Sequence, residues 1–206
     1  MIIDIITSAF NQILLFSLIP FLVYLVQRKS YKGFLQNIGL TRPTKKSIQW
    51  ALVLVSLIAI PFLILTTINE DFKSVLLHPD SVTGAISQMG LGSTSIVVIL
   101  IMAVFKTSFS EEIFFRGFLA KRLIAITNFK VGNWIHAIIF GLIHGLFFLT
   151  ITDNLLFICL IFIIPTISSY LKVIINEKMA GGSIIPGWIA HALANIISYS
   201  FIVFGG

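Results

Sequence analysis

The sequence has few charged residues and a single cysteine. Only 11% of its 206 residues are charged and 57% are hydrophobic, whereas about a quarter of the residues in a soluble domain are charged. This composition excludes an ordinary soluble domain and indicates an integral membrane protein. The lone cysteine, Cys159, lies in an apolar run; it can form no disulfide within the chain and indicates no redox function.

The sequence also lacks the basic start and small-residue cleavage site of a signal peptide. It begins Met-Ile-Ile-Asp and continues into a long apolar stretch, so we expect the N-terminus to be retained. No internal repeat or low-complexity segment is evident. We expect residues 1–206 to form a single integral membrane domain with short loops.

Six apolar stretches each approach the ~20 residues that a helix needs to cross a bilayer. They lie at about 5–27, 47–68, 94–121, 133–150, 154–176 and 183–204. The sequence therefore predicts an all-α fold, a polytopic membrane helix bundle with about six transmembrane helices. Four prolines within these stretches are expected to kink or start helices: Pro20, Pro61, Pro165 and Pro186.

Basic residues are distributed unevenly over the predicted loops. Eleven of the 14 Lys and Arg residues fall on one side, in segments 28–46, 121–130 and 172–178, whereas Lys73 is the only one on the other. By the positive-inside rule both termini lie outside a plasma membrane that the chain crosses several times. Topology explains the net charge of +6, so we expect contact with membrane lipid and no nucleic-acid partner. The outer segment 69–93 is interpreted as an ordinary loop.

Two adjacent glutamates and an arginine lie inside the third apolar stretch: Glu111, Glu112 and Arg116. Ionisable residues are costly in a bilayer, so they usually pair, face a polar cavity and mark a functional site. A structural ion pair could account for Glu112 and Arg116, but it does not account for Glu111.

Polar residues on three predicted helices lie at similar depths. Glu111 is ten residues, or about 15 Å, from the inner end of its helix. His144 lies about 16 Å from the inner end of the fourth helix, and His191 and Asn195 lie about 12 and 18 Å into the sixth. We therefore expect a single site, open to the cytoplasmic side. Each histidine alone would more often be a packing residue, and Asn195 alone could be a helix–helix hydrogen bond.

The spacing of these residues suggests hydrolysis. Residues four apart share a helix face, which pairs Glu112 with Arg116. The same spacing pairs His191 with Asn195. Glu111 is turned about 100° from Glu112, so it could activate water while His191 and Asn195 donate hydrogen bonds to an oxyanion. No nucleophile with an adjacent base is obvious, which favours attack by water.

A metal ion is possible at such a site. Glu111, His144 and His191 include the side-chain types that bind zinc. The helical HExxH signature is absent, so zinc is possible without being specifically indicated, and we assign no cofactor.

Three ordered motifs resemble those of the CPBP (CAAX protease and bacteriocin-processing, or Abi) family, which includes the type II CAAX prenyl endopeptidases. The motifs are EExxxR at Glu111–Arg116, FxxxH at Phe140–His144 and HxxxN at His191–Asn195. The resemblance covers a family-like catalytic core at about 106–200.

The resemblance implies an intramembrane endopeptidase that acts on a small membrane-associated protein or peptide. Glu111 and His144 would activate water, and Glu112 with Arg116 would organise the site. His191 and Asn195 would support the oxyanion. Family descriptions differ on whether a metal takes part, so a metalloprotease stays possible.

Other assignments stay open at this point. His136 lacks the support of a motif and is interpreted as a packing residue, and Lys106 has no assigned role. A non-enzymatic bacteriocin self-immunity protein would tolerate loss of Glu111 and His144. A transporter would use the charges as a relay, but the sequence shows no obvious inverted repeat.

Overall fold

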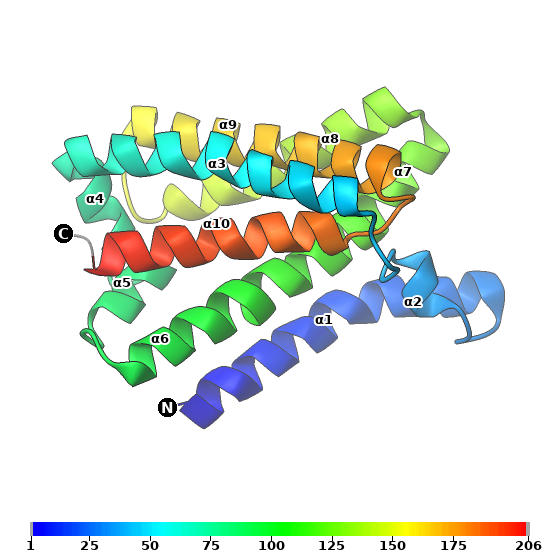
Figure 1. Cartoon of the computed structure of the whole chain (residues 1–206), viewed down its shortest axis with the longest axis horizontal. Helices are drawn as coiled ribbons and strands as arrows, with labels where there is room; N and C mark the ends of the chain where they lie inside the picture. Colours follow the sequence, from blue (N-terminus) through cyan, green and yellow to red (C-terminus); the bar gives the residue numbers. More distant parts are fainter. Residues whose placement is uncertain (1, 205–206) are drawn as a thin grey trace.

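The computed structural model describes residues 2–204, and within this range the chain is helical with no strand. Six helices are long and apolar enough to cross a membrane, which confirms the predicted all-α polytopic bundle (Figure 1). They are α1 (Ile2–Arg28), α3 (Lys45–Ile68), a third helix (Ser93–Ile126), α8 (Phe129–Phe148), a fifth helix (Leu155–Met179) and α10 (Ile185–Phe204).

The third and fifth spanning helices are composite. The third consists of α6 (Ser93–Leu100), η1 (Ile101–Phe109), η2 (Glu112–Ala120) and α7 (Lys121–Ile126), and the fifth of α9 (Leu155–Ile174) and η3 (Ile175–Met179). The η segments are π-helical, with wider turns closed by i→i+5 hydrogen bonds. Such turns are rare in proteins, and those that occur often lie at functional sites.

Side-chain caps determine where several helices begin. Asn128 accepts a hydrogen bond from the Val131 amide at 3.0 Å, so α8 starts at Phe129 instead of near residue 133. Asn154 caps α9 in the same way, and Thr44 caps α3. The third helix continues to Ile126, past the predicted end near 121, because Lys121 and Arg122 lie within α7 and not in a loop.

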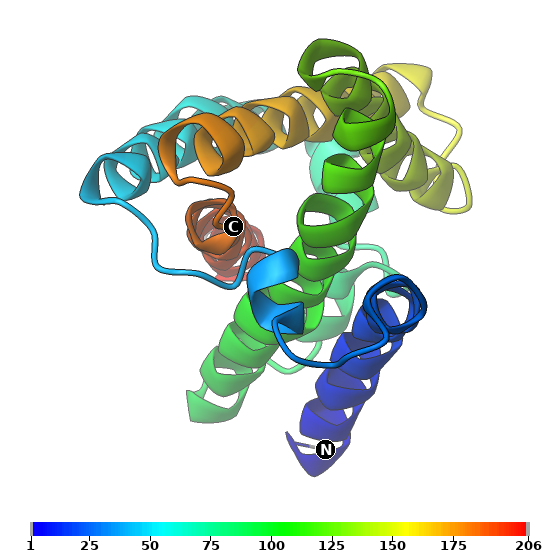
Figure 2. The ribbon, with the colours of Figure 1, turned by 90° about the vertical axis from the view of Figure 1, so that its right-hand side faces the viewer.

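The helices pack with α10 in the interior and α1 at the edge. Figure 2 shows α10 between α3 and the third spanning helix, with α1 at the periphery. Gly141 of α8 lies so close to α9 that an added Cβ would collide with Thr166 and with the Phe162 carbonyl. On α1, Gln12 donates a hydrogen bond of 2.8 Å to the backbone carbonyl of Lys106, which connects α1 to η1.

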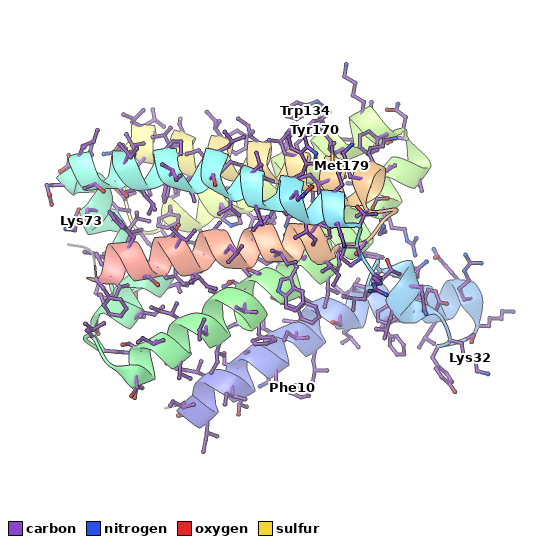
Figure 3. All side chains as sticks on the ribbon, viewed as in Figure 1. Phe10, Lys32, Lys73, Trp134, Tyr170 and Met179 are labelled. Atoms are coloured by element: carbon purple, nitrogen blue, oxygen red, sulfur yellow. The ribbon has the colours of Figure 1, made fainter. Side chains whose placement is uncertain are left out.

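The two ends of the bundle differ in charge. We call the end with segments 29–44, 127–128 and 180–184 the basic end, and the end with segments 69–92 and 149–154 the acidic end. Figure 3 places Lys32 at the basic end and Lys73 at the acidic end. The start of α1 and the end of α10 both lie at the acidic end, as an even number of crossings requires.

Segment 69–93 is not the ordinary loop that the sequence suggested. It forms α4 (Glu70–Leu76) and α5 (Val82–Ser87), and Asn69 and Ser81 cap these helices with their side chains. Phe72 and Leu76 are buried in a hydrophobic cluster with Phe157, because α4 folds back against the bundle.

The predicted prolines occupy helices as expected. Pro20, Pro61 and Pro165 lie inside α1, α3 and α9, and Pro186 is the second residue of α10.

Candidate active site

Glu112 is the centre of a buried polar cluster. Its side chain is fully buried, and its Oε1 accepts hydrogen bonds from Lys172 Nζ at 2.9 Å and His191 Nδ1 at 3.0 Å. Arg116 Nη1 lies 3.1 Å from the same oxygen as an ion pair. These three groups come from α9, α10 and η2, so one carboxylate oxygen connects three helices.

Glu111 has different surroundings, although it is the neighbouring residue. Its side chain is 19% exposed, and its Oε2 lies 3.8 Å from His191 Nε2. That separation is too long for a hydrogen bond. The two carboxylates therefore have separate environments, with Glu112 held by two hydrogen bonds and an ion pair and Glu111 at the wall of a cavity.

His191 lies between the two glutamates. Because an ionised carboxylate only accepts hydrogen bonds, the hydrogen between His191 and Glu112 is on Nδ1. His191 Nε2 is then the nitrogen that faces Glu111. A histidine oriented by a carboxylate at one nitrogen can exchange a proton at the other, as in hydrolase triads.

His144 is held by its own helix. Its Nδ1 donates to the Phe140 carbonyl at 2.8 Å, since a carbonyl only accepts. The Phe140 ring lies 4.5 Å from the His144 ring and 6.2 Å from the His191 ring, centroid to centroid. The Arg116 guanidinium carbon lies 4.0 Å from the centroid of the same ring, a cation–π contact. Phe140 thus separates the histidines and covers the arginine.

Asn195 makes hydrogen bonds between helices. Its Nδ2 donates to Thr107 Oγ1 at 3.0 Å and to Ser108 Oγ at 3.1 Å, which connects α10 to η1. Its amide is therefore engaged in the structure, although Asn195 also lines the cavity.

Arg116 has a second contact that the sequence did not indicate. Its Nη2 donates to Ser169 Oγ at 2.9 Å, and Ser169 Oγ lies 3.3 Å from His136 Nε2. Arg116 donates to the serine oxygen, and the Ser169 hydroxyl and His136 Nε2 share a second hydrogen bond. His136 is fully buried and belongs to this hydrogen-bond network behind the site.

Lys172 was assigned to the wrong place from the sequence. We counted it among the cations of an inner loop, but it is 3% exposed and bonded to Glu112. Like Arg116, Lys172 is a charged residue within a predicted span, so the sequence could have indicated it as a site residue. We grouped it with Lys178 instead, because it lies a few residues before the predicted end of the fifth stretch.

A cavity of about 430 Å³ adjoins the cluster. Its walls are mostly apolar side chains of α3, α8, α9 and α10, and Glu111, His144, Lys172, His191 and Asn195 also line it. The remaining lining residues run towards the acidic end, where Leu76 and Thr83 line it as well.

The sequence led us to expect an opening at the basic end, which the charge pattern predicts to be cytoplasmic, but the residues that line the cavity do not run to that end. At the basic end, segment 38–44 is attached to segment 179–184: the Ile184 amide donates to the Gly39 carbonyl at 2.9 Å, and Thr44 Oγ1 donates to the Met179 carbonyl at 2.9 Å. The two segments are thus joined at the basic end, and the cavity extends the other way.

The arrangement does not fit a zinc ion. Within residues 2–204, no three His, Cys, Asp or Glu side chains are grouped so as to hold a metal. The Nδ1 atoms of His144 and His191 are both occupied by other partners. Zinc, which the sequence left possible without indicating it, is given no role in the reaction proposed for this site.

A comparison with protein families identifies the family of this chain. A family model described as "type II CAAX prenyl endopeptidase Rce1-like" matches residues 93–197, about half of the chain. The chain belongs to this family. The Rce1-like family is one of CAAX-type intramembrane proteases, and its match includes all three motifs. No curated protein and no solved structure matches this Rce1-like chain.

Proposed function

We propose that the chain is an intramembrane endopeptidase that hydrolyses a peptide bond in a small membrane-associated protein or peptide, with Glu111 as the general base. The observation that carries this proposal is the contrast between two adjacent carboxylates. Glu112 is occupied by Lys172 and His191, whereas Glu111 faces the cavity. Carboxylates with different environments in one site commonly divide structural and proton-transfer roles.

In the proposed reaction Glu111 takes a proton from a water molecule. The hydroxide adds to the carbonyl carbon of the scissile bond, and the carbon–nitrogen bond then breaks. The departing amine receives the proton, so that one water is consumed and no other reactant is needed. His144 lines the cavity and would help to orient the water.

The role of His191 follows from its two neighbours. With Nδ1 bonded to Glu112 and Nε2 beside Glu111, it could carry the proton from Glu111 to the departing amine. The oxyanion role of His191 and Asn195 stays a prediction from the resemblance. The Asn195 amide would first have to leave Thr107 and Ser108.

The cavity supports an apolar substrate segment. Its volume lies in the range of ligand pockets, about 300–1,000 Å³, and the walls away from the cluster are mostly hydrophobic. An extended apolar peptide would place its peptide bond beside the charged residues of the cavity.

The test compares cells that carry the native chain with cells that carry Glu111→Gln at matched expression. Peptide mass spectrometry of membranes and medium is expected to find fragments that disappear in the variant. Loss of a general base predicts a rate reduction of about 10²–10⁴-fold. Unchanged fragments would reject Glu111 as the base, and an intact bacteriocin-immunity phenotype in the variant would favour the non-enzymatic alternative.

A further inference from the structure

Lys172 is an enclosed cation that contacts the proposed site from the fifth spanning helix. Its Nζ donates to Glu112 Oε1 at 2.9 Å. Three residues earlier on α9, Ser169 accepts a hydrogen bond from Arg116. One face of α9 therefore contacts both members of the Glu112–Arg116 pair, although α9 carries none of the three family motifs.

Lys172 balances the charge of the cluster. Glu111, Glu112, Arg116 and Lys172 sum to zero when both carboxylates are ionised and the histidines are neutral. Without Lys172, two carboxylates would share one guanidinium. An uncompensated charge in a membrane interior is costly, and a carboxylate can avoid that cost by taking up a proton. A protonated Glu111 could no longer take a proton from water.

Lys172 also determines the direction in which Glu112 points. Arg116 lies one turn from Glu112 on the same helix and could pair with it in several side-chain positions. Lys172 and His191 come from two other helices and meet at the same oxygen, Oε1. The bond from Lys172 thus holds this oxygen against His191 Nδ1, and His191 Nε2 in turn lies beside Glu111.

We propose that Lys172 is a positioning residue of the peptidase site, which keeps the two-glutamate cluster neutral and holds Glu112 against His191. This inference rests on the proposed function, because it explains how Glu111 stays ionised and how His191 stays in position for proton transfer. Lys172 acts through Glu112 and takes no part in bond making or breaking.

The experiment uses the full chain in liposomes of phosphatidylcholine and phosphatidylglycerol. The probe is a synthetic peptide that copies the sequence cleaved by the native chain but not by Glu111→Gln. Lys172→Met is expected to lower kcat by about 100-fold, the effect of a misplaced catalytic group, with KM close to the native value. Lys172→Arg keeps the charge and is expected to retain more activity. Lys106→Met, which removes another lysine from a spanning helix, is the matched control and should cleave like the native chain.

A double-mutant cycle separates positioning from simple stabilisation. If Lys172 acts through Glu112, adding Lys172→Met to Glu112→Gln should cause no further loss of kcat. This double variant also restores the charge balance, so it should stay folded even if Lys172→Met alone does not. Melting curves in detergent check the folding of each variant.

The outcomes distinguish the two proposals. Suppose that the native chain cleaves the peptide and Glu111→Gln does not. A native kcat in folded Lys172→Met would then overturn the role of Lys172 and leave the proposed function standing. Losses from Lys172→Met and Glu112→Gln that simply multiply in the double variant would overturn it as well. If Glu111→Gln cleaves like the native chain, the proposed function fails and this inference fails with it.

Discussion

Glu111 and Glu112 are neighbours in the sequence, yet their carboxylates belong to different parts of the molecule. The side chain of Glu112 is fully buried, whereas that of Glu111 is 19% exposed at the cavity wall. Neighbouring side chains on a helix point about 100° apart, and the hydrogen bonds from α9 and α10 hold Glu112. One residue holds the helices together, and the other is available to a substrate.

The Ser169 hydroxyl accepts a hydrogen bond from Arg116, the ion-pair partner of Glu112. We predict that Ser169→Ala lowers the free energy of unfolding by about 1–3 kcal/mol, because Arg116 Nη2 and His136 Nε2 would lose a buried partner. Thermal unfolding of the purified chain in detergent measures the effect.

Ser56→Ala is the matched control for this substitution. Ser56 is exposed on α3, and its hydroxyl bonds only to the Leu52 carbonyl of its own helix, at 3.4 Å. Its removal should change stability by less than about 0.5 kcal/mol. Equal effects of the two substitutions would show that the Ser169 contact adds nothing.

At the residue scale, the site residues that could be predicted by their charge were those that stand alone in an apolar run. Glu111, Glu112 and Arg116 met that condition. Lys172 lies near a helix end with other cations, and Ser169 is an uncharged residue in an apolar helix. The partners of Asn195 on η1 could not be predicted, since the sequence does not say which helices are neighbours.

At the scale of elements, the start of α10 requires a residue without a side chain. A Cβ at Gly187 would lie 2.7 Å from Asn176 Nδ2 and 2.8 Å from Glu112 Oε2. The Gly187 amide also donates to Asn176 Oδ1 at 3.0 Å. Close approach of this backbone to Glu112 is what brings His191, one turn later, to the same carboxylate.

We predict that Gly187→Ala displaces α10 from Glu112. Overpacking of this kind costs about 1–3 kcal/mol of stability, and a shift of about 1 Å at a catalytic group can lower the rate by about 100-fold. Cleavage rate and melting temperature in detergent are the measurements.

Gly92→Ala is its matched control, because no atom lies within 4 Å of a Cβ at that position and its φ of −174° is open to any residue. It should leave rate and stability near native values. A native cleavage rate in Gly187→Ala would contradict the close approach.

The number and order of the spanning helices could be predicted because each is an apolar run of membrane length. Their ends could not, since Lys121, Arg122 and Lys130 resemble loop residues but lie within helices. Glu111 lies 15 residues before Ile126 and His144 lies 15 residues after Phe129, so both remain the same number of residues from the ends of their helices.

At the scale of the whole molecule, the cavity extends towards the end of the bundle that the charge pattern places outside the cell. The lining residues extend from Glu111 towards the acidic end, beside α4 and α5, whereas the positive-inside rule places the basic end in the cytoplasm. A substrate that enters along the cavity would therefore come from the outer half of the bilayer or from outside. The orientation of the chain decides which leaflet supplies the substrate.

Chemical labelling tests that orientation, with the single native cysteine first removed by Cys159→Ser. We predict that Asp71→Cys, at an exposed position of α4 at the acidic end, reacts with a membrane-impermeant maleimide in intact cells, because few positive charges retain that end inside. Lys32→Cys, exposed at the basic end, should react only after the membrane is permeabilised. Labelling of Lys32→Cys alone in intact cells would reverse the topology, and the cavity would then extend towards the cytoplasm.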